Sequence, residues 1–299
     1  MAGLDFLLPK RLRRDFAIVP VVKLTGAILP GGSAFRPNLN LASAAPLLHK
    51  AFSIKQARAV AIAINSPGGS PVQSRLIFKR IRDLAREKDK QVLVFVEDVA
   101  ASGGYMIALA GDEIFADPSS IVGSIGVVSA SFGFPELLKK IGVERRVYTS
   151  GREKVTLDPF QPEKPADVAH LKTLQKDIHQ TFIDLVKQRR GDRLTGDDET
   201  LFNGLFWSGT KGKELGLVDG IGDLRSILQT RFGEKVHLPL IAQPRGPFAR
   251  RARGAFADSG EVSGRLAGAD EFASSAVANT LDGVIAAAQE RLLWSRYGL

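Results

Sequence analysis

The chain has 299 residues, of which 44% are hydrophobic and 24% are charged, as in an ordinary globular protein. It contains no cysteine, which excludes disulfides, cysteine nucleophiles and thiolate metal sites. The four histidines are scattered without the spacing of metal ligands, so no metal site is predicted.

The net charge of +9 is concentrated in two basic clusters, at residues 10–14 and 245–253. Solvated tails and a surface for anionic partners both explain such clusters. No nucleic-acid motif or interleaved aromatic residues accompany them, so nucleic acid is not expected as a partner. No stretch of about 18 apolar residues and no secretory signal is evident. A cytoplasmic location is therefore expected, with peripheral contact at the inner membrane through residues 4–8 and the basic residues after them as an alternative.

The hydrophobic pattern alternates between strands and helices, which predicts an α/β fold with a largely parallel sheet. Strands are predicted over 16–24, 59–64, 91–96, 113–116, 121–128 and 143–149. Helices are predicted over 39–53, 71–88, 103–110 and about 164–190, followed by two short helices that flank Trp207. The run 218–222 closes the unit.

Composition divides the chain into four parts. Residues 1–15 form a basic N-terminal segment, and residues 16–242 carry the alternating pattern. Residues 243–270 are rich in Gly, Pro, Arg, Ala and Ser, which is typical of a flexible linker. Residues 271–299 regain helical periodicity, so they predict an amphipathic helix whose apolar face needs a partner.

Ser102 lies where a predicted strand meets a predicted helix, in the run Ala100-Ala101-Ser102-Gly103-Gly104-Tyr105. The strand is expected to stop at Glu97-Asp98. A serine at such a junction can act as a nucleophile, and the N–H groups that begin the helix can stabilise an oxyanion. A serine N-cap is the alternative interpretation, and it requires no chemistry.

Two further turns follow predicted strands. The first is Ser66-Pro67-Gly68-Gly69, whose glycines allow a close backbone approach or simply form a tight turn. The second is the run 150–154, which ends in Lys154. A serine needs a base, but His49, His170 and His179 lie within predicted helices. A buried lysine can serve instead, although the residues alone do not select one among the many lysines.

Four motifs in this order resemble the S49 peptidases, the family of signal peptide peptidase A and the SohB-type proteases. They are Asn-Ser-Pro-Gly-Gly at 65–69, Ala-Ala-Ser-Gly-Gly-Tyr at 100–105, Val-Gly-Ser-Ile-Gly-Val at 122–127 and Gly-Arg-Glu-Lys at 151–154. The later runs 204–209 and 215–219 also resemble that family, and the likeness covers roughly residues 17–235. It implies a ClpP/crotonase-like fold of repeated strand-strand-helix units, here followed by the C-terminal linker and helix.

The resemblance also implies roles for particular residues. Ser102 would be the nucleophile of a Ser-Lys dyad, Lys154 the general base, and Ser124 the serine that orients the lysine. Gly68, Gly69 and Gly103 would form the oxyanion hole. No cofactor is implied.

In this family the lysine can come from an adjacent subunit, and the chain has one copy of the motif set. The resemblance therefore implies a homo-oligomer with intersubunit active sites. The implied substrates are short or unfolded apolar peptides. Two alternatives stay open: a crotonase-like protein that binds acyl-CoA, and a non-catalytic scaffold at a membrane surface.

Overall fold

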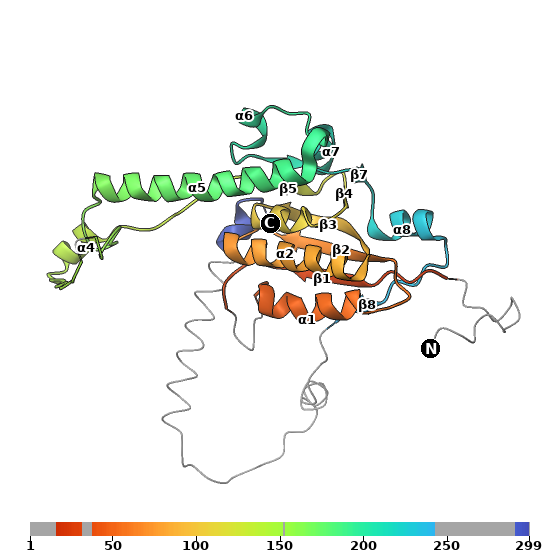
Figure 1. Cartoon of the computed structure of the whole chain (residues 1–299). Helices are drawn as coiled ribbons and strands as arrows, with labels where there is room; N and C mark the ends of the chain where they lie inside the picture. Colours follow the sequence, from red (N-terminus) through yellow and green to blue (C-terminus); the bar gives the residue numbers. More distant parts are fainter. Residues whose placement is uncertain (1–15, 32–37, 152, 243–290, 299) are drawn as a thin grey trace, which may run out of the picture.

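The computed structural model describes residues 16–31, 38–151, 153–242 and 291–298 (Figure 1). Its strands are β1 Val21–Thr25, β2 Ala59–Ser66, β3 Gln91–Ala101, β4 Glu113–Ala116, β5 Ile121–Gly123, β6 Phe206–Ser208, β7 Gly220–Ile221 and β8 Leu240–Ile241. Its α-helices are α1 Leu41–Phe52, α2 Pro71–Lys88, α3 Gly103–Ala108, α4 Pro135–Lys140, α5 Pro165–Arg190, α6 Asp198–Leu201, α7 Gly209–Glu214 and α8 Leu224–Phe232. The predicted segments 1–15 and 243–270, and residues 271–290 of the predicted last helix, lie outside the described residues.

The eight strands form one sheet in the order β6-β5-β3-β2-β1-β8, with β4 paired to β3 and β7 paired to β4. Every pairing is parallel except that of β5 with β6. The α/β fold predicted from the alternating pattern is therefore confirmed. No helix in the described part of the chain is long and apolar enough to cross a bilayer.

Strand β2 shows why the central strands are hydrophobic throughout. Val60, Ile62 and Ile64 face the main core, beneath α1, α2 and α3. Ala59 and Ala61 face a second apolar cluster, which α8 covers on the opposite side of the sheet. Because both faces are buried, a parallel strand of this kind has a continuous apolar sequence rather than an alternating one.

Helix α2 has the same bounds as its prediction, 71–88, because its ends are marked by local chemistry. The side chain of Ser70 accepts a hydrogen bond from the Gln73 amide, and Pro71 occupies the first turn, where its missing N–H costs nothing. Asp89 ends the helix in the left-handed conformation, with φ of 49°.

Strand β3 corrects one prediction, because it continues past Glu97-Asp98 to Ala101. Its pairing with β2 shifts register after Ile64, and its other neighbour changes from β4 to β5. The charged pair lies at this change and is used there: Lys23 donates to Glu97 over 2.6 Å, and Asn65 donates to Asp98 over 2.5 Å. Charge therefore marks a change of partner strand instead of the strand's end.

A segment of the chain extends away from the sheet, and we call residues 128–164 the arm (Figure 1). None of its described residues is buried. The strand predicted over 143–149 is absent there, and β5 ends at Gly123 rather than near 128. A strand needs a neighbour to satisfy its backbone, and the described part of this single chain offers the arm none.

Candidate active site

Ser102 joins the end of β3 to the start of α3 in an unusual conformation, with φ of 52° and ψ of −121°. Its amide donates to the Gly123 carbonyl over 2.8 Å. Its side chain makes no capping hydrogen bond, in contrast to Ser70 at the start of α2. A non-glycine residue with such a backbone costs about 1–3 kcal/mol, a strain often found at functional sites. Ser102 therefore occupies the N-cap position of α3, but its hydroxyl is not used as a cap.

Ser124 lies beside Ser102 because of the strand pairing. Ala101 of β3 is paired with Gly123 of β5, and each serine is the next residue along its chain. Ser124 also has a positive φ, 53°, and only 3% of its surface is exposed. Its amide donates to the Leu205 carbonyl over 2.8 Å. The sheet thus brings the two predicted serines to one edge.

The turn Gly68-Gly69 packs directly against Ser102 and Gly103. A methyl group placed on Gly68 would lie 2.8 Å from both Ser102 Cβ and the Gly103 nitrogen. The peptide groups on both sides of Gly69 form hydrogen bonds with Ile28. The Ile28 N–H donates to the Gly68 carbonyl, and the Ser70 N–H donates to the Ile28 carbonyl. In such a parallel bridge the Gly69 N–H points the other way, away from Ile28.

Two backbone N–H groups, one in this turn and one in the adjoining helix, are available to donate a hydrogen bond to a ligand. Within the described residues, no hydrogen bond uses the N–H of Gly69 or of Gly103. The N–H of Gly68, by contrast, donates to Ser66 Oγ over 3.2 Å. A methyl group on Gly103 would lie 3.4 Å from the Gly69 nitrogen, so the two free amides are close together.

A cleft of about 690 Å³ opens over these groups. Its lining includes Gly69, Ser102 and Ser124 from the predicted set. It also includes His179 of α5, whose Nε2 bonds to the Ile125 carbonyl at 3.0 Å. His179 is not among the predicted site residues, because its helical surroundings in the sequence give no sign of a site.

Lys154 is the one predicted site residue that lies apart from the others. It is exposed, belongs to the arm and is not among the residues that line the cleft. Its amide donates to the Gly151 carbonyl over 3.2 Å. Ser102 Oγ has no hydrogen-bond partner within the described residues, so this part of the chain supplies no base in contact with it.

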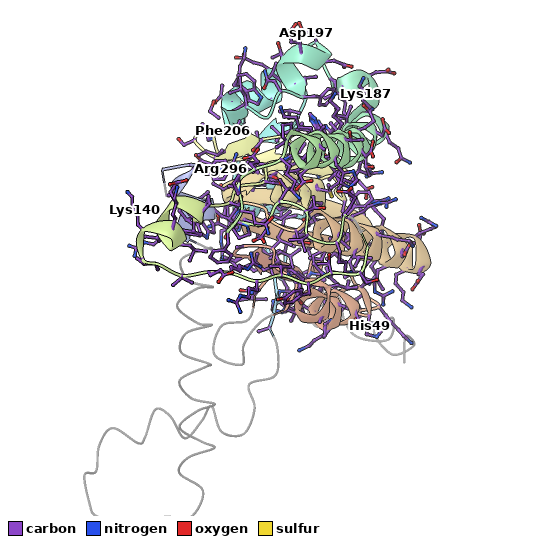
Figure 2. The ribbon with its side chains drawn as sticks, turned by 90° about the vertical axis from the view of Figure 1, so that its left-hand side faces the viewer. His49, Lys140, Lys187, Asp197, Phe206 and Arg296 are labelled. Carbon is purple, nitrogen blue, oxygen red and sulfur yellow. The ribbon has the colours of Figure 1, made fainter. Side chains whose placement is uncertain are left out.

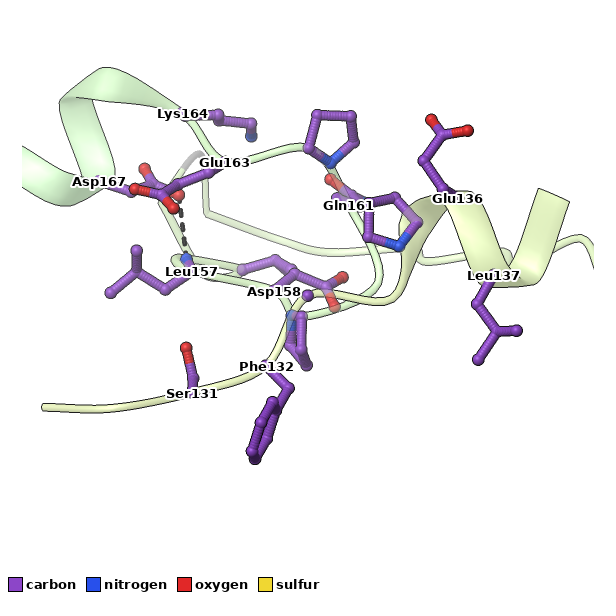
Figure 3. A pocket seen from close by; sticks show the side chains of 15 residues that line it. Ser131, Phe132, Glu136, Leu137, Leu157, Asp158, Gln161, Glu163, Lys164 and Asp167 are labelled. Carbon is purple, nitrogen blue, oxygen red and sulfur yellow. Dashed lines mark hydrogen bonds between the residues drawn. The ribbon is translucent and has the colours of Figure 1, made fainter. Parts of the chain in front are cut away.

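The arm has a smaller cavity of its own, of about 370 Å³ (Figure 3). Phe132, Leu157 and Asp167 are among its lining residues, and the Asp167 carboxylate accepts a hydrogen bond from the Leu157 amide over 3.0 Å. This contact ties the segment after Lys154 to the first turn of α5. The arm therefore has a defined local structure although it makes no core of its own.

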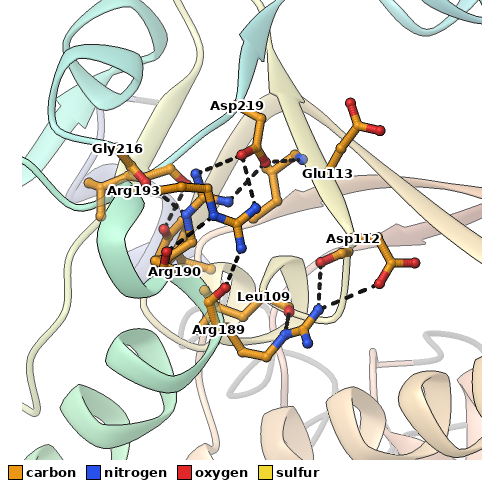
Figure 4. A network of polar contacts seen from close by, with 12 residues as sticks. Leu109, Asp112, Glu113, Arg189, Arg190, Arg193, Gly216 and Asp219 are labelled. Atoms are coloured by element: carbon orange, nitrogen blue, oxygen red, sulfur yellow. Dashed lines mark hydrogen bonds and ion pairs between the residues drawn. The ribbon is translucent and has the colours of Figure 1, made fainter.

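The other end of α5 is anchored by a partly buried ionic network (Figure 4). Arg190 donates to both carboxylate oxygens of Asp219, over 2.8 and 3.0 Å, and its side chain is 2% exposed. Asp219 also accepts from the Ile114 amide of β4 over 2.7 Å. Burial alone would raise the pKa of Asp219, but the hydrogen bonds and charge of Arg190 outweigh it and lower that pKa. The network fixes α5, and with it His179, against the sheet.

Fold and site together define an α/β protein of the ClpP/crotonase class, with a strained serine at a strand-to-helix junction. The family model of peptidase family S49 matches residues 84–235, half of the chain. The chain belongs to that family, as the resemblance predicted.

Three known proteins illustrate the likeness. The chain is 61% identical to a protein of Brucella abortus (strain 2308) named Na(+)/H(+) antiporter NhaA, over 98% of this chain and 38% of that protein. This chain therefore spans well under half of the length of that relative. It is 32% identical to the chloroplastic serine protease SPPA of Arabidopsis thaliana, over 65% of this chain and 29% of that protein. A solved mutant of the 1510-N membrane-bound stomatin-specific protease aligns with a TM-score of 0.46 and 16% identity, over 77% of this chain and 99% of that one.

Proposed function

We propose that this chain is a serine endopeptidase that cleaves short or unfolded apolar peptides, with Ser102 as nucleophile and Lys154 of a neighbouring copy as base. The observation that carries the proposal is the position of Ser102. Its hydroxyl has no partner in its own described chain, and it lies at a strained junction next to two free amides. Membership of a peptidase family favours this chemistry over acyl-CoA binding or a scaffold.

The proposed reaction begins when a neutral lysine takes the proton of Ser102 Oγ as that oxygen attacks a peptide carbonyl. The N–H groups of Gly69 and Gly103 stabilise the resulting oxyanion, while Gly68 lets the turn approach the serine closely. The lysine then gives the proton to the leaving amine. Water hydrolyses the acyl-enzyme with the same lysine as base.

The arm supports a base supplied by another copy. It extends from the sheet, carries Lys154 and exposes large apolar side chains, although an unpartnered apolar surface of this kind is costly in water (Figure 1). Those side chains are Phe132, Leu137, Ile141, Val143, Tyr148 and Phe160. Contact with a second copy would bury them. It would also desolvate a lysine there, which is the condition for a neutral amine near neutral pH.

The lining of the cleft supports an apolar, extended substrate. Leu29, Val127 and Val128 contribute apolar surface beside the serine. We expect a segment without tertiary structure to enter such a cleft more readily than the compact surface of a folded protein. We therefore expect cleavage of unfolded proteins and of peptides with apolar side chains near the scissile bond.

The experiment is hydrolysis of casein and of a fluorogenic apolar peptide by the purified protein, compared with Ser102→Ala and Lys154→Ala. Both variants should lose activity while keeping the wild-type assembly and melting temperature. Ser124→Ala should reduce turnover less, because Ser124 orients the base and takes no part in bond making. Ser226→Ala on α8 and Lys235→Ala, both exposed and outside the cleft, are the matched controls. An assembled wild type that cleaves nothing, or full activity in Lys154→Ala, would refute the proposal.

A further inference from the structure

Residues 291–298, far along the chain from the catalytic motifs, lie against the cleft. Leu293 and Arg296 are part of its lining, together with Ser102 and Ser124. Arg296 lies on the same side of the molecule as Phe206 of β6 (Figure 2). The segment is thus a wall of the site that belongs to none of the sequence motifs.

Tyr297 anchors this segment and is 7% exposed. Its ring meets that of Phe206 edge to face, with centroids 5.0 Å apart and planes at 72°. It also packs with Val99 and Ala101 at the end of β3, just before Ser102. Its hydroxyl lies 3.2 Å from Ser124 Oγ and 3.4 Å from the Pro67 carbonyl oxygen.

We infer that Tyr297 is a positioning residue that holds the hydroxyl of Ser124 in the orientation the lysine base requires. This inference rests on the proposed peptidase. It follows from burial, because a serine with 3% exposure cannot be oriented by bulk water and needs a protein partner. Among the described residues, Tyr297 is the one whose side chain bonds to Ser124 Oγ.

The hydrogen-bond chain Pro67–Tyr297–Ser124 can adopt two directions. With Tyr297 donating to Ser124, the serine oxygen keeps a second lone pair that can accept from an N–H of a neutral lysine, whose own lone pair stays free to take the Ser102 proton. With Tyr297 donating to the Pro67 carbonyl, Ser124 donates to Tyr297 and its own oxygen accepts from an ammonium. The pair therefore suits both protonation states of the lysine through rotation of two hydroxyls, and no proton is transferred along it.

The test is the variant Tyr297→Phe, which removes one oxygen and keeps the ring against Phe206. We expect kcat for the fluorogenic peptide to fall about 3- to 10-fold, the usual effect of one lost hydrogen bond, with KM unchanged. In a Ser124→Ala background the same change should have no further effect, because the group that Tyr297 orients is gone. Ser295→Ala is the matched control: its hydroxyl bonds to the Leu292 carbonyl in the same segment and is not in the cleft lining.

Any other result would overturn the inference. An unchanged kcat would mean that Tyr297 only packs, and an increased kcat would mean that the segment restrains the site. An equal loss with and without the Ser124 hydroxyl would place the effect elsewhere. If wild type and Ser102→Ala are equally inactive, the peptidase itself is refuted, and the role of Tyr297 in it falls too.

Discussion

At the scale of single residues, the site depends on backbone conformations that most side chains do not permit. Gly69 has φ of 138°, and a methyl group on it would lie 2.1 Å from the Ile28 carbonyl oxygen. Ser102 and Ser124 adopt positive φ although they carry a Cβ, so the surrounding hydrogen bonds must hold them there. These conformations place Ser102 close to the amides of Gly69 and Gly103.

Replacement of Gly69 by alanine tests this requirement. The clash between the added methyl group and Ile28 must displace residue 69, and its N–H is displaced with it. We therefore expect Gly69→Ala to lower activity at least about 100-fold, the usual loss for one oxyanion donor. The control is Gly233→Ala, which has a similarly left-handed φ of 94° but nothing within 4 Å of an added methyl group. That control should lose about 1 kcal/mol of stability and no activity. Hydrolysis rates and thermal melts measure both effects, and full activity in Gly69→Ala would contradict the assignment of its N–H.

At the scale of elements, the site is positioned by the way β3 and α5 are held. β3 is paired on both sides, and its change of partner from β4 to β5 brings Ser124 next to Ser102. α5 supports the arm at one end and is fixed to the sheet at the other by the Arg190–Asp219 pair. A rigid helix between those ends fixes where the arm projects.

Removal of the Asp219 charge tests this anchor. Asp219→Asn leaves the buried Arg190 without its counter-charge, which should lower the free energy of unfolding by about 3–5 kcal/mol. The pKa of Asp219 is lower in the folded protein than its ordinary value of 3.8. The ion pair therefore stabilises the fold fully above that ordinary value, and its contribution is lost as the pH falls through the folded-state pKa.

Urea unfolding at a series of pH values measures the effect. The difference between wild type and Asp219→Asn should be constant at about pH 5–7 and shrink below about pH 4. Asp83→Asn is the control, because its pair with Lys79 lies on the surface of α2 and should contribute no more than about 0.5 kcal/mol. Equal stability of wild type and Asp219→Asn at pH 7 would contradict the role of the anchor.

At the scale of the whole molecule, a single chain keeps the proposed base apart from the proposed nucleophile. The serines and glycines meet at one edge of the sheet, whereas the lysine lies on the exposed arm. An assembly in which the arm of one copy reaches the cleft of the next would bury apolar surface and complete each site.

Mixing two inactive variants tests this arrangement. Ser102→Ala retains the lysine and Lys154→Ala retains the serine. When they are dissociated and reassembled together at equal amounts, about a quarter of the sites should combine an intact serine with an intact lysine from the next copy. The rate of peptide hydrolysis should recover to the same fraction of the wild-type rate. A mixture of Ser102→Ala with the double variant should stay inactive. Co-assembly without recovered activity would show that each chain uses its own lysine.

The α/β class, the bounds of α2 and the position of Ser102 can be predicted from the sequence, because each depends on local chemistry: apolar periodicity, capping residues and glycine next to a small polar side chain. The other features of the site appear only in the folded chain. The continuation of β3, the absence of a strand at 143–149, the free Gly69 amide and the contact of Tyr297 with Ser124 all depend on neighbours that are distant in the chain. Local pattern carries no record of those neighbours, because pairing and burial are settled only when the sheet forms.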